Sequence, residues 1–298
     1  MEDLKEYEKC KLCAHLCGVN RFNVTGRCHM NNKMIISRAA LHHWEEPVIS
    51  GDCGSGAIFF SGCSLGCMYC QNSEISRGSN GVEISIERLS DIMLELKAKG
   101  AHNINLVTPT HYVPSIRRAL ISAKSRGLDL PIVYNTSSFD SVETLRMLEG
   151  LVDVYLPDLK YYSNKTAKKL SNAEFYPQAA RLAIEEMVRQ IPTPVVKDGL
   201  MSRGVIVRIL LLPSHVAEAK LTLKYLYERF GDSIYISLMN QYTPMPGMQS
   251  PLNRRVTHAE YDELLLYAEK LGLKNGFSQE ADSASDCFIP SFDGTGLK

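Results

Sequence analysis

Apolar and polar residues alternate in blocks along most of this 298-residue chain. Short, nearly continuous apolar runs are typical of parallel strands buried on both faces. Six such runs cover residues 57–61, 103–108, 131–136, 152–159, 204–212 and 234–239. Between them, apolar residues recur with the period of an α-helix. These predicted helices cover 86–99, 114–126, 141–149, 174–190, 215–230 and 258–271.

This order of strands and helices predicts an α/β fold with a parallel sheet. Six strands are too few to close an eight-stranded barrel, so we expect a partial (β/α)6 barrel or an open doubly wound sheet. In both architectures, ligands bind where the carboxyl ends of the strands meet. The functional residues are therefore expected directly after the strands.

Composition and charge narrow the class of protein. Lys plus Arg and Asp plus Glu number 33 each, so the formal net charge is zero. This balance favours neither a nucleic-acid partner nor a membrane surface. The sequence has no apolar run of about 18 to 20 residues that would predict a membrane span, and residues 1–6 are charged. We expect a cytoplasmic enzyme.

The cysteines are unevenly distributed. There are nine in the chain, and eight of them lie within the first 70 residues. Clustered thiols in a chain of this size indicate metal binding or redox chemistry rather than a disulfide framework. We expect residues 1–52 to form a cysteine-rich metal-binding segment. Residues 53–298 would form the partial barrel, with a C-terminal tail over its mouth. Cys53 and Cys287 belong to neither cysteine group and are expected to be small buried apolar side chains.

The strongest motif is Cys63-Ser-Leu-Gly-Cys67-Met-Tyr-Cys70, directly after the first predicted strand. A structural zinc site takes four protein ligands, and a fourth nearby ligand is missing. A [4Fe–4S] cluster normally takes four thiolates, so three cysteines would leave one iron open to another ligand. The alternatives are a zinc loop completed by a distant thiol, or three thiols without metal.

This C-x3-C-x2-C spacing resembles the radical S-adenosylmethionine (SAM) superfamily. The resemblance implies that the amino and carboxylate groups of SAM chelate the open iron. Reduction of the cluster would then cleave the sulfonium and generate a 5′-deoxyadenosyl radical. Tyr69, directly before the third cysteine, matches an aromatic position that contacts adenine in the family. The resemblance also implies a partial barrel of six strands and helices.

More narrowly, the chain resembles the pyruvate formate-lyase activating enzymes and their PflX-like relatives. The segments that carry this likeness are 10–21, 59–63, 101–111, 154–160 and 240–244. It implies that a hydrogen atom is abstracted from a protein or peptide substrate, such as the glycine Cα of a glycyl-radical enzyme. It also implies an external electron donor such as flavodoxin or ferredoxin. The residues themselves leave the substrate open.

The end of the second strand departs from that branch. Activating enzymes carry a Gly-Gly-Glu-like motif here, which binds the methionine amino group. This chain has Thr108-Pro-Thr110-His instead. Thr108 or Thr110 would offer hydroxyl or backbone acceptors to SAM, or would simply form a polar turn.

The third and fourth strands end in Asn135-Thr136 and in Asp158-Leu-Lys160. The resemblance places these residues around the methionine carboxylate and a monovalent cation, although Asn135 stands where the branch has an aspartate. Asp158 and Lys160 face the same side of a strand because they are two residues apart. We expect them to pair at a ligand site, or as a structural salt bridge.

Two further strand ends complete the predicted SAM pocket. Arg208 is the only charged residue in the apolar run 204–213. A buried guanidinium needs an anionic partner, which would be Asp158 or a cofactor carboxylate. Gln241 ends the sixth strand and would reach the ribose or the substrate. The parallel order predicts that Thr136, Asp158 and Arg208 converge with the cysteine loop.

The N-terminal segment contains four potential ligands, Cys10, Cys13, Cys17 and Cys28. The segment is too short to build its own core, so a bound metal would hold it together. The metal would be zinc or an auxiliary [4Fe–4S] cluster able to relay electrons. We favour the cluster. Reduced thiols without metal are the remaining alternative.

Two functions are consistent with these motifs. One is an enzyme that reductively cleaves SAM. The other is a non-catalytic iron–sulfur or zinc protein that carries electrons or serves as an assembly module. The second function needs no SAM pocket. Release of 5′-deoxyadenosine after anaerobic reconstitution and reduction with dithionite in the presence of SAM would support the first function.

Overall fold

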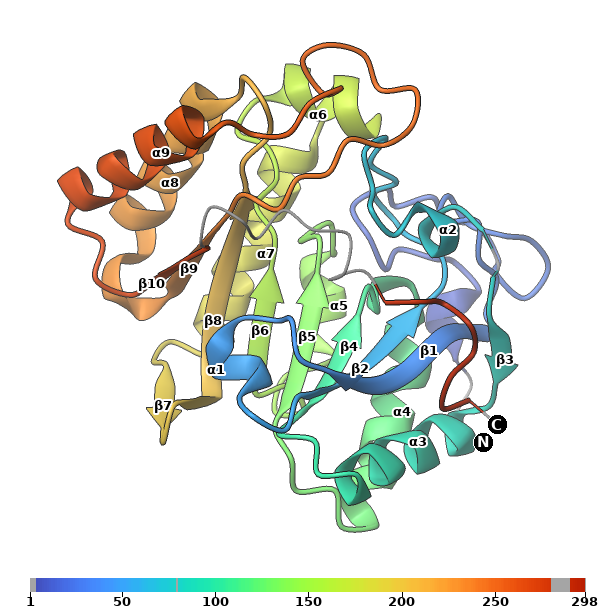
Figure 1. Cartoon of the computed structure of the whole chain (residues 1–298). Coiled ribbons are helices and arrows are strands. Elements are labelled where there is room, and N and C mark those ends of the chain that lie inside the picture. The colour runs from blue at the N-terminus through green and yellow to red at the C-terminus, as the bar shows by residue number, and fades with distance from the viewer. Residues whose placement is uncertain (1–3, 79, 280–289, 298) are drawn as a thin grey trace.

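The computed structural model describes residues 4–78, 80–279 and 290–297 (Figure 1). Their strands form one sheet, with the order β10-β9-β8-β6-β5-β4-β2-β1-β3 and with β7 paired to β8. The strands are β1 (Met34–His42), β2 (Ser55–Phe60), β3 (Val82–Ile84), β4 (Ile104–Val107), β5 (Ile132–Thr136), β6 (Val154–Pro157), β7 (Val195–Lys197), β8 (Leu200–Leu210), β9 (Tyr235–Met239) and β10 (Gly276–Ser278).

The centre of the sheet is parallel. β2, β4, β5, β6, β8 and β9 are adjacent and run in the same direction, and they correspond to the six predicted strands. Every residue of β2, β4, β5 and β6 is buried, which explains their nearly continuous apolar sequence. β10 adds another parallel strand beside β9. The predicted α/β fold with a mainly parallel sheet is confirmed.

The six predicted helices are present. The longer helices are α3 (Ile86–Ala98), α4 (Val113–Ser125), α7 (Tyr176–Gln190), α8 (Val216–Phe230) and α9 (His258–Leu271). The shorter elements are α1 (Pro47–Ser50), α2 (Ser73–Ser76), α5 (Val142–Arg146), α6 (Asn164–Ser171), η1 (Lys5–Tyr7), η2 (Thr110–Tyr112) and η3 (Gly231–Ser233). α6 was not predicted because its sequence, NKTAKKLS, is short and mostly polar.

The N-terminal segment is built into the same sheet. β1 pairs with β2 in antiparallel register, with His42 opposite Ser55. The chain then turns over one face of the sheet, where α1 lies in front of β8 and β6 (Figure 1). Ile49 of α1 packs with Val154 and Ile206. Residues 43–50 therefore cover part of the sheet face that the helices α5 and α7 leave free.

The C-terminal residues return to β1. The amide of Ala39 donates to the carbonyl of Thr295 at 2.9 Å, and the ring of Phe292 lies 5.5 Å from that of Phe59. Much of the tail predicted to cover the barrel mouth, with Cys287, lies at 280–289, outside the described residues. In the described part of the chain, no helix is long and apolar enough to cross a membrane.

Candidate functional site

A cavity of about 500 Å³ opens where the parallel strands end. It is lined by eleven of the predicted site residues, which are Cys63, Cys67, Tyr69, Cys70, Thr108, Asn135, Thr136, Asp158, Lys160, Arg208 and Gln241. Thr110 is buried in η2 outside this lining, with its hydroxyl oxygen 3.4 Å from that of Thr136. The four N-terminal cysteines also lie outside the cavity.

The cysteine loop is fixed from several sides. Gly62, directly before Cys63, has φ +84°, and a Cβ there would lie 3.0 Å from the carbonyl oxygen of Cys28. Only glycine tolerates this combination of conformation and close approach. The guanidinium of Arg77 donates to the carbonyl of Cys67 at 3.2 Å. Gln71, directly after Cys70, donates to the carbonyl of Gln241 at 2.8 Å.

The three thiols of this loop face the same cavity. Burial, together with the nearby thiolates of Cys70 and Cys67, raises the pKa of Cys63 to about 12. The Cys63 thiol therefore needs a bound metal to be held deprotonated. Within the described ranges, no three or more His, Cys, Asp or Glu side chains are gathered as the ligands of a single metal ion. Three soft donors on a roomy cavity wall fit an iron–sulfur cluster.

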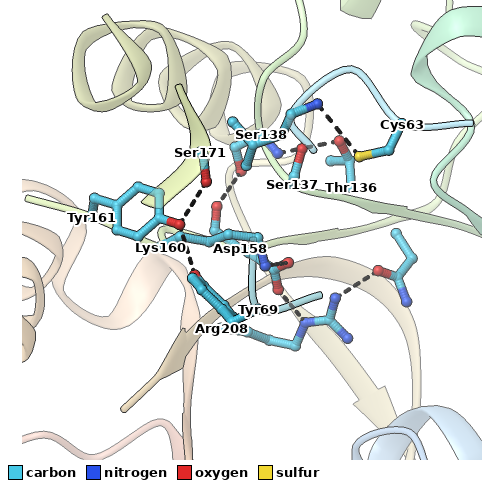
Figure 2. Close-up of polar contacts among 12 residues, drawn as sticks. Cys63, Tyr69, Thr136, Ser137, Ser138, Asp158, Lys160, Tyr161, Ser171 and Arg208 are labelled. Atoms are coloured by element: carbon cyan, nitrogen blue, oxygen red, sulfur yellow. Dashed lines mark hydrogen bonds and ion pairs between the residues drawn. The ribbon is translucent and has the colours of Figure 1, made fainter. Parts of the chain in front are cut away.

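Tyr69 is held rigidly beside these cysteines. Its hydroxyl accepts a hydrogen bond from Tyr161 at 2.8 Å, and Tyr161 in turn lies 2.6 Å from the hydroxyl of Ser171 (Figure 2). The ring of Tyr242 packs against that of Tyr69 with 6.0 Å between centroids. The aromatic ring is thus fixed at the edge of the cavity before any ligand binds.

A buried network of charges lines the same cavity as the loop. Arg208 Nε donates to Asp158 Oδ1 at 2.8 Å, and Lys160 Nζ donates to Asp158 Oδ2 at 2.7 Å (Figure 2). Arg208 also donates to Glu45 Oε2 at 3.2 Å and to Asn135 Oδ1 at 2.6 Å. The structure therefore shows the expected Asp158–Lys160 pair and gives Arg208 two carboxylate partners.

Asp158 and Lys160 keep their charges despite burial. Burial by itself raises the pKa of Asp158, but Arg208 and Lys160 outweigh this effect and lower the pKa. Burial lowers the pKa of Lys160, but Asp158 raises it above its usual value. The positive charge of Arg208 lies beside the neutral side chain of Asn135.

Sequence reasoning missed one part of the site, the stretch His42-His-Trp-Glu45-Glu46. All five of these residues line the cavity. Glu45 Oε1 accepts hydrogen bonds from Asn105 at 3.2 Å and from Asn135 at 3.1 Å. The sequence feature that could have identified this part of the site is the pair of adjacent glutamates beside a tryptophan. They lie outside the strand ends where functional residues were expected.

The burial of the Glu46 carboxyl group is only partly offset by polar partners. It is 7% exposed, and among the described residues its Oε2 has no hydrogen-bond partner. Burial raises the pKa of Glu46 to about 7, while Arg208 lowers it and Glu45 raises it. Glu46 is therefore partly protonated near neutral pH.

Comparison with known proteins identifies the family. Residues 57–205, which are half of the chain, match the sequence model of the radical SAM superfamily, and the chain belongs to this superfamily. Over 278 residues it is 28% identical to the uncharacterized protein MJ0674 of Methanocaldococcus jannaschii. That alignment covers 90% of this chain and 76% of the relative.

Solved structures share the fold. SuiB of Streptococcus suis bound to SAM superposes with a TM-score of 0.52 and 12% identity, over 74% of this chain and 49% of SuiB. SuiB bound to the precursor peptide SuiA gives a TM-score of 0.53 and 13% identity, over 74% of this chain and 47% of SuiB. The match thus spans about half of SuiB. A radical SAM domain implies a [4Fe–4S] cluster and SAM as cofactors.

The raised pKa of Glu46 predicts a pH-dependent stability. Between about pH 4.5 and 7 the folded state holds a proton that the unfolded state has released, so this group destabilises the fold as pH rises. We expect Glu46→Gln to remove that loss. The difference in the free energy of unfolding, variant minus parent, should therefore be about 2 to 3 kcal/mol larger at pH 8 than at pH 5.

Urea unfolding of both proteins at the two pH values measures this difference. The matched control is Glu83→Gln, because Glu83 is exposed and pairs with exposed Lys33. The control should differ from the parent equally at both pH values. A Glu46→Gln variant that behaves like the control would contradict the assigned environment of Glu46.

Proposed function

We propose that this chain binds a [4Fe–4S] cluster through Cys63, Cys67 and Cys70 and binds SAM in the adjoining cavity. The observation that carries this proposal is that the three thiols and the polar strand ends line one cavity. When bound, the two groups supply reductive cleavage of SAM and removal of a hydrogen atom from a substrate. A non-catalytic iron–sulfur or zinc protein would not need the cavity.

The side chains of the cavity divide into ligand-binding and positioning roles. Lys160 has one hydrogen bond to Asp158 and further N–H donors for the carboxylate of SAM. Tyr69 offers its fixed ring to the adenine, and Thr108 and Gln241 offer polar groups from two other strand ends. Arg208 keeps Asp158 ionised from the side opposite Lys160.

Thr136 acts as a positioning residue. Its hydroxyl donates to Asp140 Oδ2 at 2.6 Å and accepts from the amide of Ser138 at 3.2 Å. Its carbonyl accepts from the amide of Asp158 at 2.8 Å. These bonds leave little capacity for a ligand, so Thr136 fixes the neighbouring strand ends. Thr110, buried behind it, supports the same turn.

We further propose a protein or peptide substrate and an external electron donor such as flavodoxin or ferredoxin. The likeness to the PflX-like branch supports this proposal and extends it to a glycine Cα as the hydrogen donor. The SuiB fold, which accommodates the precursor peptide SuiA, is consistent with a peptide at this site.

A second metal centre is proposed at Cys10, Cys13, Cys17 and Cys28. Burial, together with the thiolates of Cys28, Cys10 and Cys17, raises the pKa of Cys13 to about 12. Cys13 therefore lies within electrostatic range of the other three thiols. Backbone hydrogen bonds, such as Gly18 N to Cys10 O at 2.9 Å, fold the segment around them. We favour a [4Fe–4S] cluster over zinc here.

The two thiol groups are close neighbours in the fold. The Cys28 carbonyl lies against Gly62, which precedes Cys63. His15, between Cys13 and Cys17, lies near the backbone of Ser64, which directly follows Cys63. A cluster in the N-terminal segment would thus lie beside the loop that holds the first cluster, as an electron relay requires.

The central test replaces Cys63, Cys67 and Cys70 by Ala. After anaerobic reconstitution, the variant should contain about four fewer irons per chain than the parent. With dithionite and SAM, the parent should release 5′-deoxyadenosine and the variant should not. Cys53→Ala is the control, because Cys53 lies outside both cysteine groups and is exposed, so the prediction that it is buried was wrong. Unchanged iron content in the triple variant would refute the assignment.

A second variant, with Cys10, Cys13, Cys17 and Cys28 replaced by Ala, tests the other centre. We expect it to lose a further set of about four irons while the iron at the cavity loop remains. Elemental analysis and Mössbauer spectroscopy measure both quantities. Loss of zinc instead of iron would establish the alternative metal. Equal metal content in parent and variant would exclude the second centre.

A further inference from the structure

The cavity has an acidic end, formed by Trp44, Glu45 and Glu46, that the proposed cofactors do not explain. These residues follow His42, which pairs with Ser55 at the amino end of β2. The cysteine loop follows the carboxyl end of the same strand. After His42 the chain turns over the sheet, and Glu45 accepts hydrogen bonds from Arg208 at 3.2 Å and from Asn135 at 3.1 Å. The acidic end therefore adjoins the charged residues at the strand ends and lines the same cavity as the thiols.

The acidic end carries more carboxyl groups than the neighbouring cations can pair with. Among the described Asp, Glu, Lys and Arg side chains that line the cavity, three are carboxylates, namely Glu45, Glu46 and Asp158. Two are cations, Lys160 and Arg208. Asp158 contacts both cations, and Glu45 contacts Arg208. Glu46 is left as the excess carboxylate.

The position of Glu46 is that of a ligand-binding group. Its Oε2 is buried and has no hydrogen-bond partner in the described part of the chain, and the residue lines the cavity. An unpaired buried carboxylate is costly, and a cationic ligand would remove that cost. The indole of Trp44 lines the same end, and aromatic faces attract organic cations.

We infer that the acidic end is the substrate subsite and that it takes an aliphatic ammonium group, with Glu46 as the specificity-determining residue. The inference rests on the proposed function, which assigns the thiol-lined wall to the cofactors. The ammonium group would belong to a lysine side chain of a peptide or to a free amine. The raised pKa of Glu46 is consistent with this role, because a bound cation would favour its ionised form.

Binding of four probes to the reconstituted full-length protein tests the inference. The cationic probes are pentylammonium and acetyl-Gly-Lys-Gly-amide. Their neutral counterparts are pentan-1-ol and acetyl-Gly-norleucine-Gly-amide. Dissociation constants are measured by calorimetry with saturating SAM present. We expect at least one cationic probe to bind at least about tenfold more tightly than its neutral counterpart, and the preferred probe identifies a peptide or a free amine as the source.

The Glu46→Gln variant should reduce this preference to about twofold or less, because the amide keeps the shape but loses the charge. Glu46→Asp should retain part of the preference, and Glu83→Gln should leave it unchanged. Equal affinities for charged and neutral probes in the parent protein would overturn the inference without any variant. An unchanged preference in Glu46→Gln would also overturn it.

Two further measurements separate the possible failures. If the ammonium preference disappears when SAM is added, the acidic end binds the amino group of SAM and the substrate assignment is wrong. Release of 5′-deoxyadenosine by the parent protein is measured independently of the probes. Cleavage without ammonium preference contradicts only this inference, whereas ammonium preference without cleavage contradicts only the proposed function.

Discussion

The ion pairs of Arg208 connect the parts of the molecule that form the site. Its guanidinium bonds to Asp158 at the end of β6, to Asn135 in β5 and to Glu45 from the N-terminal segment. A buried guanidinium needs these partners, because it does not lose its proton. Removing one partner of such a group leaves an uncompensated buried charge. The cavity wall, the strand ends and the segment 43–46 therefore depend on one another.

A second buried arginine connects the N-terminal cysteines to the barrel. Arg21 is fully buried, donates to the carbonyls of Met30, Asn31 and His111, and lies 4.8 Å from the ring centroid of Tyr7. These contacts join the cysteine-rich turns to η2, which follows β4. Arg208 and Arg21 thus join two parts of the N-terminal segment to the rest of the fold, Arg208 through the carboxylate of Glu45 and Arg21 through the carbonyl of His111.

The sequence was most informative where the structure is local and regular. The strands and major helices were predictable because buried parallel strands are apolar throughout and helices such as α3 repeat with a fixed period. The pairing of Asp158 with Lys160 followed from their two-residue spacing, and the need of Arg208 for an anion followed from its apolar surroundings. The identity of Glu45 as a partner did not follow, because 163 residues separate the two positions.

Other parts of the site depend on contacts that no local pattern encodes. Glu46 belongs to the site only because the chain after β1 turns over the sheet face. Thr108 lines the cavity while Thr110, two residues later, is buried behind it, because Thr108 adopts φ +59° and redirects the chain into η2. Such a reversal of direction depends on tertiary packing, and the residue types at these positions do not reveal it.

The most direct test of the account is the electron paramagnetic resonance spectrum of the reduced protein, recorded with and without SAM labelled with ¹⁵N and ¹⁷O in its amino and carboxylate groups. The account predicts a changed cluster signal and hyperfine coupling to the labels, because the cavity would hold SAM against the cluster at Cys63, Cys67 and Cys70. An iron–sulfur signal that is identical with and without SAM would contradict it.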